Sequence, residues 1–180
     1  MAVTLGGWGE TPMMLDHLRR MARYNRWANR RLYAACAALP ESEYLAARPA
    51  FFGSIHGTLN HLLVADRIWL ARLRGEPNPG YRLDDRPYPT LAALQAAREA
   101  EDEGLIATVD GDDEATLAGD LVYRTVVPPQ AEIRTPRHLC WLHLYNHQTH
   151  HRGQAHDQLS QTAVPPPPLD LLYYLREVGA

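Results

Sequence analysis

The sequence of 180 residues contains no lysine, only two cysteines and no apolar stretch that approaches the length of a membrane span. Its basic residues are therefore arginines, and they are spread along the chain instead of forming a basic run. With a net charge of −3, this distribution predicts no nucleic-acid partner. A membrane-spanning helix needs about 20 apolar residues, so we also predict no membrane partner.

The two cysteines, Cys36 and Cys140, stand in helical patterns among apolar neighbours. This setting favours reduced thiols in the core over a disulfide or a cysteine-based zinc site. The N-terminus also lacks the order of charged, apolar and small residues that marks a signal peptide. Together these absences predict a cytoplasmic protein.

The chain is long enough for one substantial core, because 46% of its residues are hydrophobic. Residues 1–12 are rich in glycine and lack a periodic pattern, which predicts a flexible leader. We therefore predict a single helical domain over residues 13–180.

Hydrophobic periodicity and helix-capping residues divide this domain into helices. Long helices are predicted over residues 13–39, 54–74, 91–109 and 135–161, and a short one over residues 169–177. Ser54 and Thr90 are the expected N-caps of the second and third helices. Thr135 is the expected N-cap of the fourth, with Pro136 at its first position.

The segments between these helices are predicted to be links. Residues 41–53 are expected to form a loop, and residues 75–89 a long loop of the kind often found beside a site. Residues 111–134 contain short β-prone runs and predict an irregular crossover or a weak hairpin. The expected fold class is all-α, a four-helix bundle with a short C-terminal helix.

Acidic residues gather on the third predicted helix, at Glu99, Glu101, Asp102 and Glu103. We interpret them as a solvated acidic face. A carboxylate metal ligand from this helix is the less favoured alternative.

Histidines gather on the fourth predicted helix. Five of the nine fall within fourteen residues: His143, His147, His150, His151 and His156. Imidazole is the commonest protein ligand of transition metals, and residues four apart share one face of a helix. Helical geometry favours the pair His147 and His151, although the spacing of His143 and His147 is equally good. On the second helix, His61 falls on an apolar face and is expected to point inward.

The other histidines have simpler interpretations. His143 and His150 are expected to be hydrogen-bond donors beside a site or polar groups at the edge of the core. We interpret the rest as ordinary surface or capping residues: His17, His56, His138 and His156.

Three segments resemble a known family. Asn60 to Leu63 with Asp66 and Trp69, and the run from Asn146 to Gln154, look like the two signature helices of the DinB/YfiT-like family of damage-inducible metalloproteins. The segment from Tyr24 to Asn29 is similar to the family as well. The resemblance implies a four-helix bundle with crossover, up-up-down-down connections that is often dimeric.

The resemblance also implies a divalent metal held by His61, His147 and His151. Three imidazoles leave an open coordination position, which can polarise a bound group or lower the pKa of a thiol. Zinc or nickel suits such a site best, and manganese or iron is compatible with it. The resemblance implies a metal-dependent enzyme that activates a low-molecular-weight thiol, such as bacillithiol or mycothiol, in an S-transferase or isomerase reaction.

Four residues near these ligands are candidates for hydrogen bonds to them or for cofactor and substrate contacts: Asn60, His150, Arg152 and Gln154. The expected partners are a small-molecule thiol or electrophile. A homodimer is also possible through the arginine-rich first helix and the apolar C-terminal segment. The alternative function is a non-catalytic metal-binding or stress-associated bundle. A third hypothesis is a bundle without metal.

Overall fold

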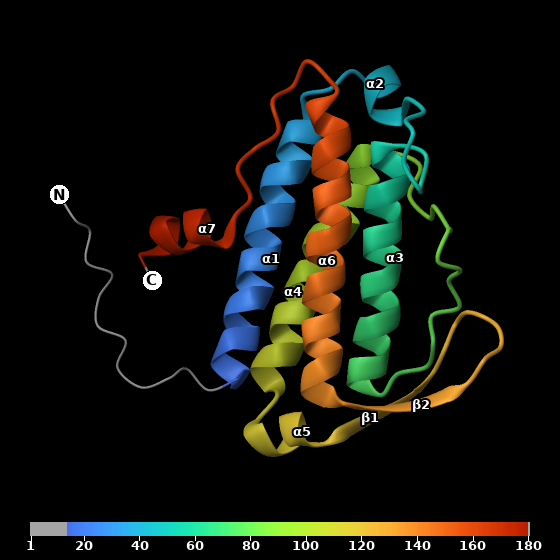
Figure 1. The fold of residues 1–180 in the computed structure, drawn as a ribbon, viewed down its shortest axis with the longest axis vertical. Helices are drawn as coiled ribbons and strands as arrows, with labels where there is room; N and C mark the ends of the chain where they lie inside the picture. Colours follow the sequence, from blue (N-terminus) through green and yellow to red (C-terminus); the bar gives the residue numbers. More distant parts are fainter. Residues whose placement is uncertain (1–13, 180) are drawn as a thin grey trace.

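The computed structural model describes residues 14–179, so the predicted leader lies outside the described residues. Within this range the chain forms seven helices and one two-stranded sheet (Figure 1). The long helices are α1 (Met14–Ala37), α3 (Ile55–Arg74), α4 (Leu91–Gly111) and α6 (Arg137–Ser160). The short elements are α2 (Glu41–Leu45), α5 (Glu114–Ala118), β1 (Asp120–Arg124), β2 (Glu132–Pro136) and α7 (Leu171–Val178). The predicted all-α bundle is confirmed.

Two of the three predicted helix caps are confirmed. The Ser54 hydroxyl accepts a hydrogen bond from the backbone N–H of Gly57, and Thr90 caps α4 in the same way. The prediction for the fourth helix is wrong, because α6 begins at Arg137 without a side-chain cap. Thr135 and Pro136 lie in β2 instead, where Thr135 pairs with Leu121 of β1.

The links contain more structure than expected. The weak hairpin is present as β1 and β2, which pair antiparallel. The short helices α2 and α5 lie in segments predicted to be loop or irregular. A helix of five residues is little more than one turn, so it leaves almost no periodicity for the sequence to reveal.

The four long helices run up, down, down and up in the order of the chain, which Figure 1 shows. Hydrogen bonds between side chains agree with this order. Arg23 of α1 bonds Asp110 of α4, whereas Asn29, further along α1, bonds Asp102, which comes earlier in α4. The expected up-up-down-down order therefore does not occur, and the bundle has one lengthwise crossover.

The crossover is the link at residues 75–90, which returns along the bundle so that α3 and α4 are parallel (Figure 1). The link at residues 38–54 has a similar length but folds into α2 and tight turns at one end of the bundle. Their lengths alone do not distinguish the two links. The different paths of the two links depend on contacts made in the folded protein.

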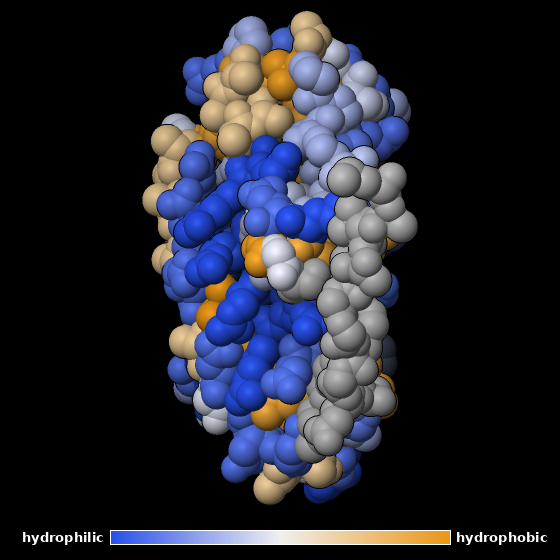
Figure 2. All heavy atoms as spheres, turned by 90° about the vertical axis from the view of Figure 1, so that its left-hand side faces the viewer, coloured by the Kyte–Doolittle hydropathy of each residue, from blue (hydrophilic) through white to orange (hydrophobic). Residues whose placement is uncertain are grey.

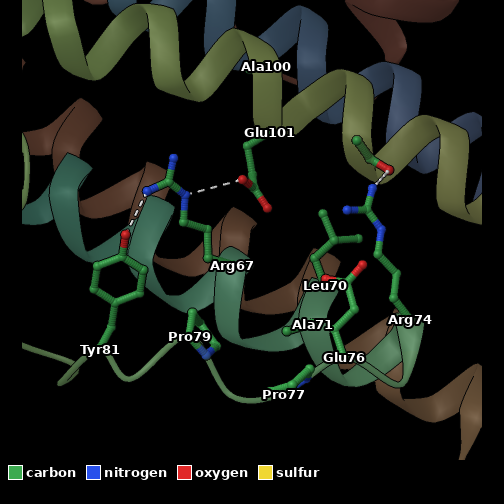
Figure 3. Close-up of a pocket in the computed structure, with 11 residues that line it drawn as sticks. Arg67, Leu70, Ala71, Arg74, Glu76, Pro77, Pro79, Tyr81, Ala100 and Glu101 are labelled. Atoms are coloured by element: carbon green, nitrogen blue, oxygen red, sulfur yellow. Dashed lines mark hydrogen bonds and ion pairs between the residues drawn. The ribbon is translucent and has the colours of Figure 1, made fainter.

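Arg67 of α3 holds the crossover against the bundle. Its guanidinium donates to the hydroxyls of Tyr81 at 2.9 Å and Tyr88 at 2.7 Å, and to Glu101 of α4 at 3.3 Å. Figure 3 shows Arg67 between Tyr81 and Glu101, beside a cavity of about 270 Å³. These bonds fix the part of the chain that passes His61.

Two large apolar clusters fill the bundle and lie at different levels along it. One contains Leu18, Leu105 and Trp141, and the other contains Leu32 and Leu94. Between them lies a group of buried polar residues that we call the polar layer. Its members come from all four long helices: Asn25, Asn29, Asp66, Arg98, Asp102, Gln148 and Arg152.

The charges of the polar layer balance one another. Arg98 pairs with Asp66 at 2.6 Å and with Asp102 at 3.1 Å. Burial raises the pKa of both carboxyls, and the guanidinium of Arg98 opposes that rise. On the other side of the layer, Arg152 donates to the side-chain oxygens of Asn25 and Asn29.

The polar layer corrects the expectation of a fully solvated acidic face on the third helix. Glu99 and Glu103 are exposed, whereas only 2% of Asp102 is exposed. Asp102 stands four residues after Arg98, on the buried side of α4. Residues four apart on a helix share one face, and Arg98 and Asp102 share the face of α4 that carries core residues. This spacing was the signal in the sequence that could have placed them inside.

The surface that carries α7 is mostly hydrophilic, with separate hydrophobic patches, as Figure 2 shows. Leu172, Tyr173 and Val178 of α7 are exposed. The homodimer stays a prediction. Both cysteines are buried and free, and none of the helices within residues 14–179 has the length and apolarity needed to cross a membrane.

Candidate metal centre

Three histidines meet between α3 and α6. His61 of α3 and His147 and His151 of α6 each present a ring nitrogen, and these three atoms lie within 4.8 Å of one another. The Nε2 atoms of His61 and His147 are 3.3 Å apart. The ring centroid of His151 lies 4.6 Å from that of His61 and 4.4 Å from that of His147. This cluster, which we call the triad, can hold a metal ion.

Hydrogen bonds orient two of the three rings. His61 Nδ1 lies 2.7 Å from the backbone oxygen of Leu83, and His151 Nδ1 lies 2.8 Å from the side-chain oxygen of Gln154. An oxygen of either kind only accepts, so each Nδ1 carries the proton. The lone pair of each ring is therefore on Nε2, where it is available to a metal.

Burial keeps the triad neutral. It lowers the pKa of His61 to about 4, against the opposing effect of the hydrogen bond to Leu83. Burial, followed by the neighbouring histidines, lowers the pKa of His147 to about 3, and burial also lowers the pKa of His151. Neutral imidazole is the form that binds metals, so the triad is ready for a metal near neutral pH.

An aromatic ring covers one side of the triad. Phe52 stacks on His61 with a centroid distance of 3.9 Å, and its ring meets His151 edge-on at 5.5 Å. Sequence reasoning missed this residue. A signal was present, since Phe51 and Phe52 are the only phenylalanines of the chain and directly precede the Gly53-Ser54 start of α3.

Two of the four residues predicted to assist the ligands lie beside the triad. Gln154 accepts from His151, and its amide nitrogen lies 3.2 Å from His150 Nε2. The ring of His150 is 4.7 Å from that of His151. Gln154 thus connects one histidine of the triad to a neighbouring histidine that is exposed to solvent.

Asn60 has a different position from the one expected. It is completely buried, and its amide exchanges two hydrogen bonds with the backbone of Tyr88. Asn60 therefore fixes the crossover, as Arg67 does. Its connection with the site is indirect, because Leu83 of the same segment orients His61.

Arg152 lies away from the triad, although it follows His151 in the sequence. A helix turns by about 100° per residue, and this rotation directs Arg152 toward α1. There it packs over the ring of Tyr24 and lines a separate cavity of about 210 Å³. Arg152 therefore belongs to the polar layer and does not take the predicted position beside the metal site.

The remaining histidines are divided between surface and core. The ring of His143 is 6.0 Å from that of His147 and packs on Trp69 at 4.8 Å, outside the triad. The geometry therefore favours the pair His147 and His151. The surface interpretation is wrong for His56, which is buried and bonded to the hydroxyl of Tyr44.

Comparison with known protein families gives a match. The sequence pattern of the DinB family matches residues 14–178, a range that includes every described helix from α1 to α7. No curated protein matches the chain significantly.

Proposed function

The chain belongs to the DinB family, and on that premise we propose that it is a divalent-metal-dependent enzyme that activates a low-molecular-weight thiol. The observation that carries the proposal is the convergence of three neutral imidazoles, two of them oriented through Nδ1. Among the described residues no carboxylate or thiol joins this cluster. A metal held by the triad would keep an open coordination position.

The ligand set suits zinc or nickel best, and manganese or iron is compatible with it. A bound divalent ion would supply Lewis acidity, which lowers the pKa of a coordinated thiol toward neutrality.

The residues of the chain would contribute orientation and exclusion of water. Leu83 and Gln154 hold the rings of His61 and His151 in one tautomer, so little reorganisation is needed when a metal binds. Phe52 covers His61 and keeps water from that side. Exclusion of water strengthens electrostatic interactions within the site.

The reaction we propose is S-transfer or isomerisation. In the transfer, the thiol gives its proton to solvent, and its sulfur forms a bond to an electrophilic carbon. The leaving group departs with the electron pair of the bond that breaks. The partners are therefore a small thiol and a small electrophile.

The test begins with elemental analysis of protein purified without a histidine tag. The metal-loaded protein is then incubated with several bacterial thiols and a chromogenic electrophile. We expect thiol-dependent turnover that is lost in His151→Ala and kept in His17→Ala, which changes an exposed histidine on α1. Equal rates for the wild type and His151→Ala would overturn the catalytic proposal.

Two other outcomes identify the alternatives. Stoichiometric metal without turnover would favour a non-catalytic metal-binding or stress-associated bundle. Absence of metal, with no thermal stabilisation on addition of zinc or nickel, would favour a bundle without metal, because a ligand of the folded state raises its stability.

A further inference from the structure

A cavity of about 440 Å³ lies next to the triad, between residues 48–51 and the C-terminal part of α6. His150 and Gln154 line it, and the side-chain oxygen of the same Gln154 accepts a hydrogen bond from His151. The cavity and the triad thus share a wall. A small molecule in the cavity would lie against His150 and Gln154, on the side of the cavity that faces His151.

Gln158 provides a buried acceptor at this cavity. The hydroxyl of Thr58 donates to the backbone oxygen of Ser54 at 3.0 Å, so it can only accept from Gln158. The amide nitrogen of Gln158 supplies that bond at 3.0 Å. This arrangement fixes the orientation of the amide and leaves its oxygen as a free acceptor.

The side-chain oxygen of Gln158 accepts no hydrogen bond from the described residues, although only 2% of Gln158 is exposed. A buried acceptor without a partner is unfavourable, because it loses its hydrogen bond to water and gains none in return. Gln158 lines the cavity, so a ligand whose hydroxyl or amide N–H reached this oxygen would supply the missing donor.

The charges around the cavity disfavour anions. Asp157 contributes an exposed carboxylate. The guanidinium of Arg48 is engaged by the carboxylate of Glu43 at 3.2 Å and by two backbone oxygens. The remaining wall includes Phe51, 89% exposed, whose ring offers an apolar face for stacking.

We propose that this cavity is the subsite for the non-reacting end of the thiol, and that it selects an uncharged end with hydroxyl donors over an anionic or purely apolar one. The proposal rests on the proposed function, since the sulfur of the same ligand would lie at the triad. Gln158 is the specificity-determining residue, and Asp157 acts against anions.

The test compares thiols that differ only in the non-reacting end: thioglycerol, mercaptopropionate and propanethiol. Their dissociation constants are measured by calorimetry with the metal-loaded protein. We expect thioglycerol to bind most tightly. Gln158→Leu should weaken thioglycerol about threefold to tenfold, the effect of losing one hydrogen bond, and should leave propanethiol unchanged.

Two further variants complete the experiment. Gln95→Leu changes a half-buried glutamine of α4 that bonds Glu99 and does not line the cavity, so it should preserve the preference for thioglycerol. Asp157 is exposed, so Asp157→Asn should leave the fold intact. It therefore tests the subsite even if Gln158→Leu fails to fold. It should tighten mercaptopropionate about twofold, because a like charge is removed.

The outcomes separate this proposal from the proposed function. Equal constants for the three thiols, an unchanged preference in Gln158→Leu and Asp157→Asn, or no thiol binding would overturn the subsite. Absorption of the cobalt-substituted protein reports separately whether sulfur reaches the metal. A sulfur-to-cobalt band without any preference would therefore reject the subsite and retain the metal-thiol proposal.

Discussion

The triad and the polar layer are both polar clusters inside the same bundle, and they differ in what their members can do for one another. In the polar layer, Arg98 lies between Asp66 and Asp102, so opposite charges meet. In the triad, three imidazoles of the same kind point their nitrogens at one place. The first cluster neutralises itself, whereas the second lacks an internal partner of opposite charge.

This difference separates a structural cluster from a site. The triad can hold a metal ion, and a bound cation would supply the partner of opposite character that the cluster lacks. The neighbours His151 and Arg152 illustrate the contrast, since adjacent residues on one helix belong to different clusters. Changes in the polar layer should therefore affect stability, and changes around the triad should affect metal binding.

The largest effect is expected for Arg98→Met. Removal of the guanidinium leaves two buried carboxylates facing each other, which should lower the free energy of unfolding by about 3–5 kcal/mol. Urea unfolding measures this loss. The matched control is Arg30→Met, which removes an exposed ion pair with Glu103 and should cost at most about 1 kcal/mol. Similar losses in the two variants would contradict the structural role of the polar layer.

The second largest effect, on metal affinity, is expected for Gln154→Leu. Loss of the bond to His151 Nδ1 frees the ring to rotate, so metal affinity should fall about 10-fold to 100-fold while stability without metal changes little. Competition with a chelating dye measures the affinity. Gln95→Leu should bind metal as the wild type does, and an equal affinity in Gln154→Leu would show that the bond does not orient the ligand.

A smaller effect is expected from pH in the metal-free protein. In the unfolded chain histidine titrates near 6.5, whereas the folded pKa values are about 4 for His61 and about 3 for His147. Between these values only the unfolded chain binds the protons. The free energy of unfolding should therefore be fully retained above pH 6.5 and fall below it, by at most about 1.4 kcal/mol per pH unit for each histidine.

Urea unfolding of metal-free protein between pH 7 and pH 5 tests this dependence. The His147→Ala variant should show a shallower slope, because it lacks one of the two strongly shifted groups. A wild-type slope no steeper than that of the variant would contradict the burial argument.

The smallest effect is expected for His143→Ala. His143 is exposed and lies outside the triad, so metal affinity should change by no more than about 0.5 kcal/mol, roughly twofold. The same dye competition applies. A loss as large as that of Gln154→Leu would return His143 to the ligand set and weaken the choice of His147 with His151.

Much of this arrangement could be predicted from local patterns. The caps at Ser54 and Thr90 depend on residues within one turn, and the spacing of His147 and His151 is a property of a single helix. Asp102 could not be placed as readily, because a carboxylate among acidic neighbours has the appearance of a surface residue. Phe52 and Leu83 also escaped prediction, since their contacts with His61 join links to a helix and depend on how those links fold.

By itself the sequence determined the approximate positions of the four long helices, the face that His147 and His151 share, and the resemblance that adds His61. These features arise from periodicity and short-range spacing, which are present in any helix of this sequence. Only the tertiary structure decided the direction of each helix, the division between triad and polar layer, and the proton position on His61. Those depend on groups from separate helices and links, which meet only when the bundle closes.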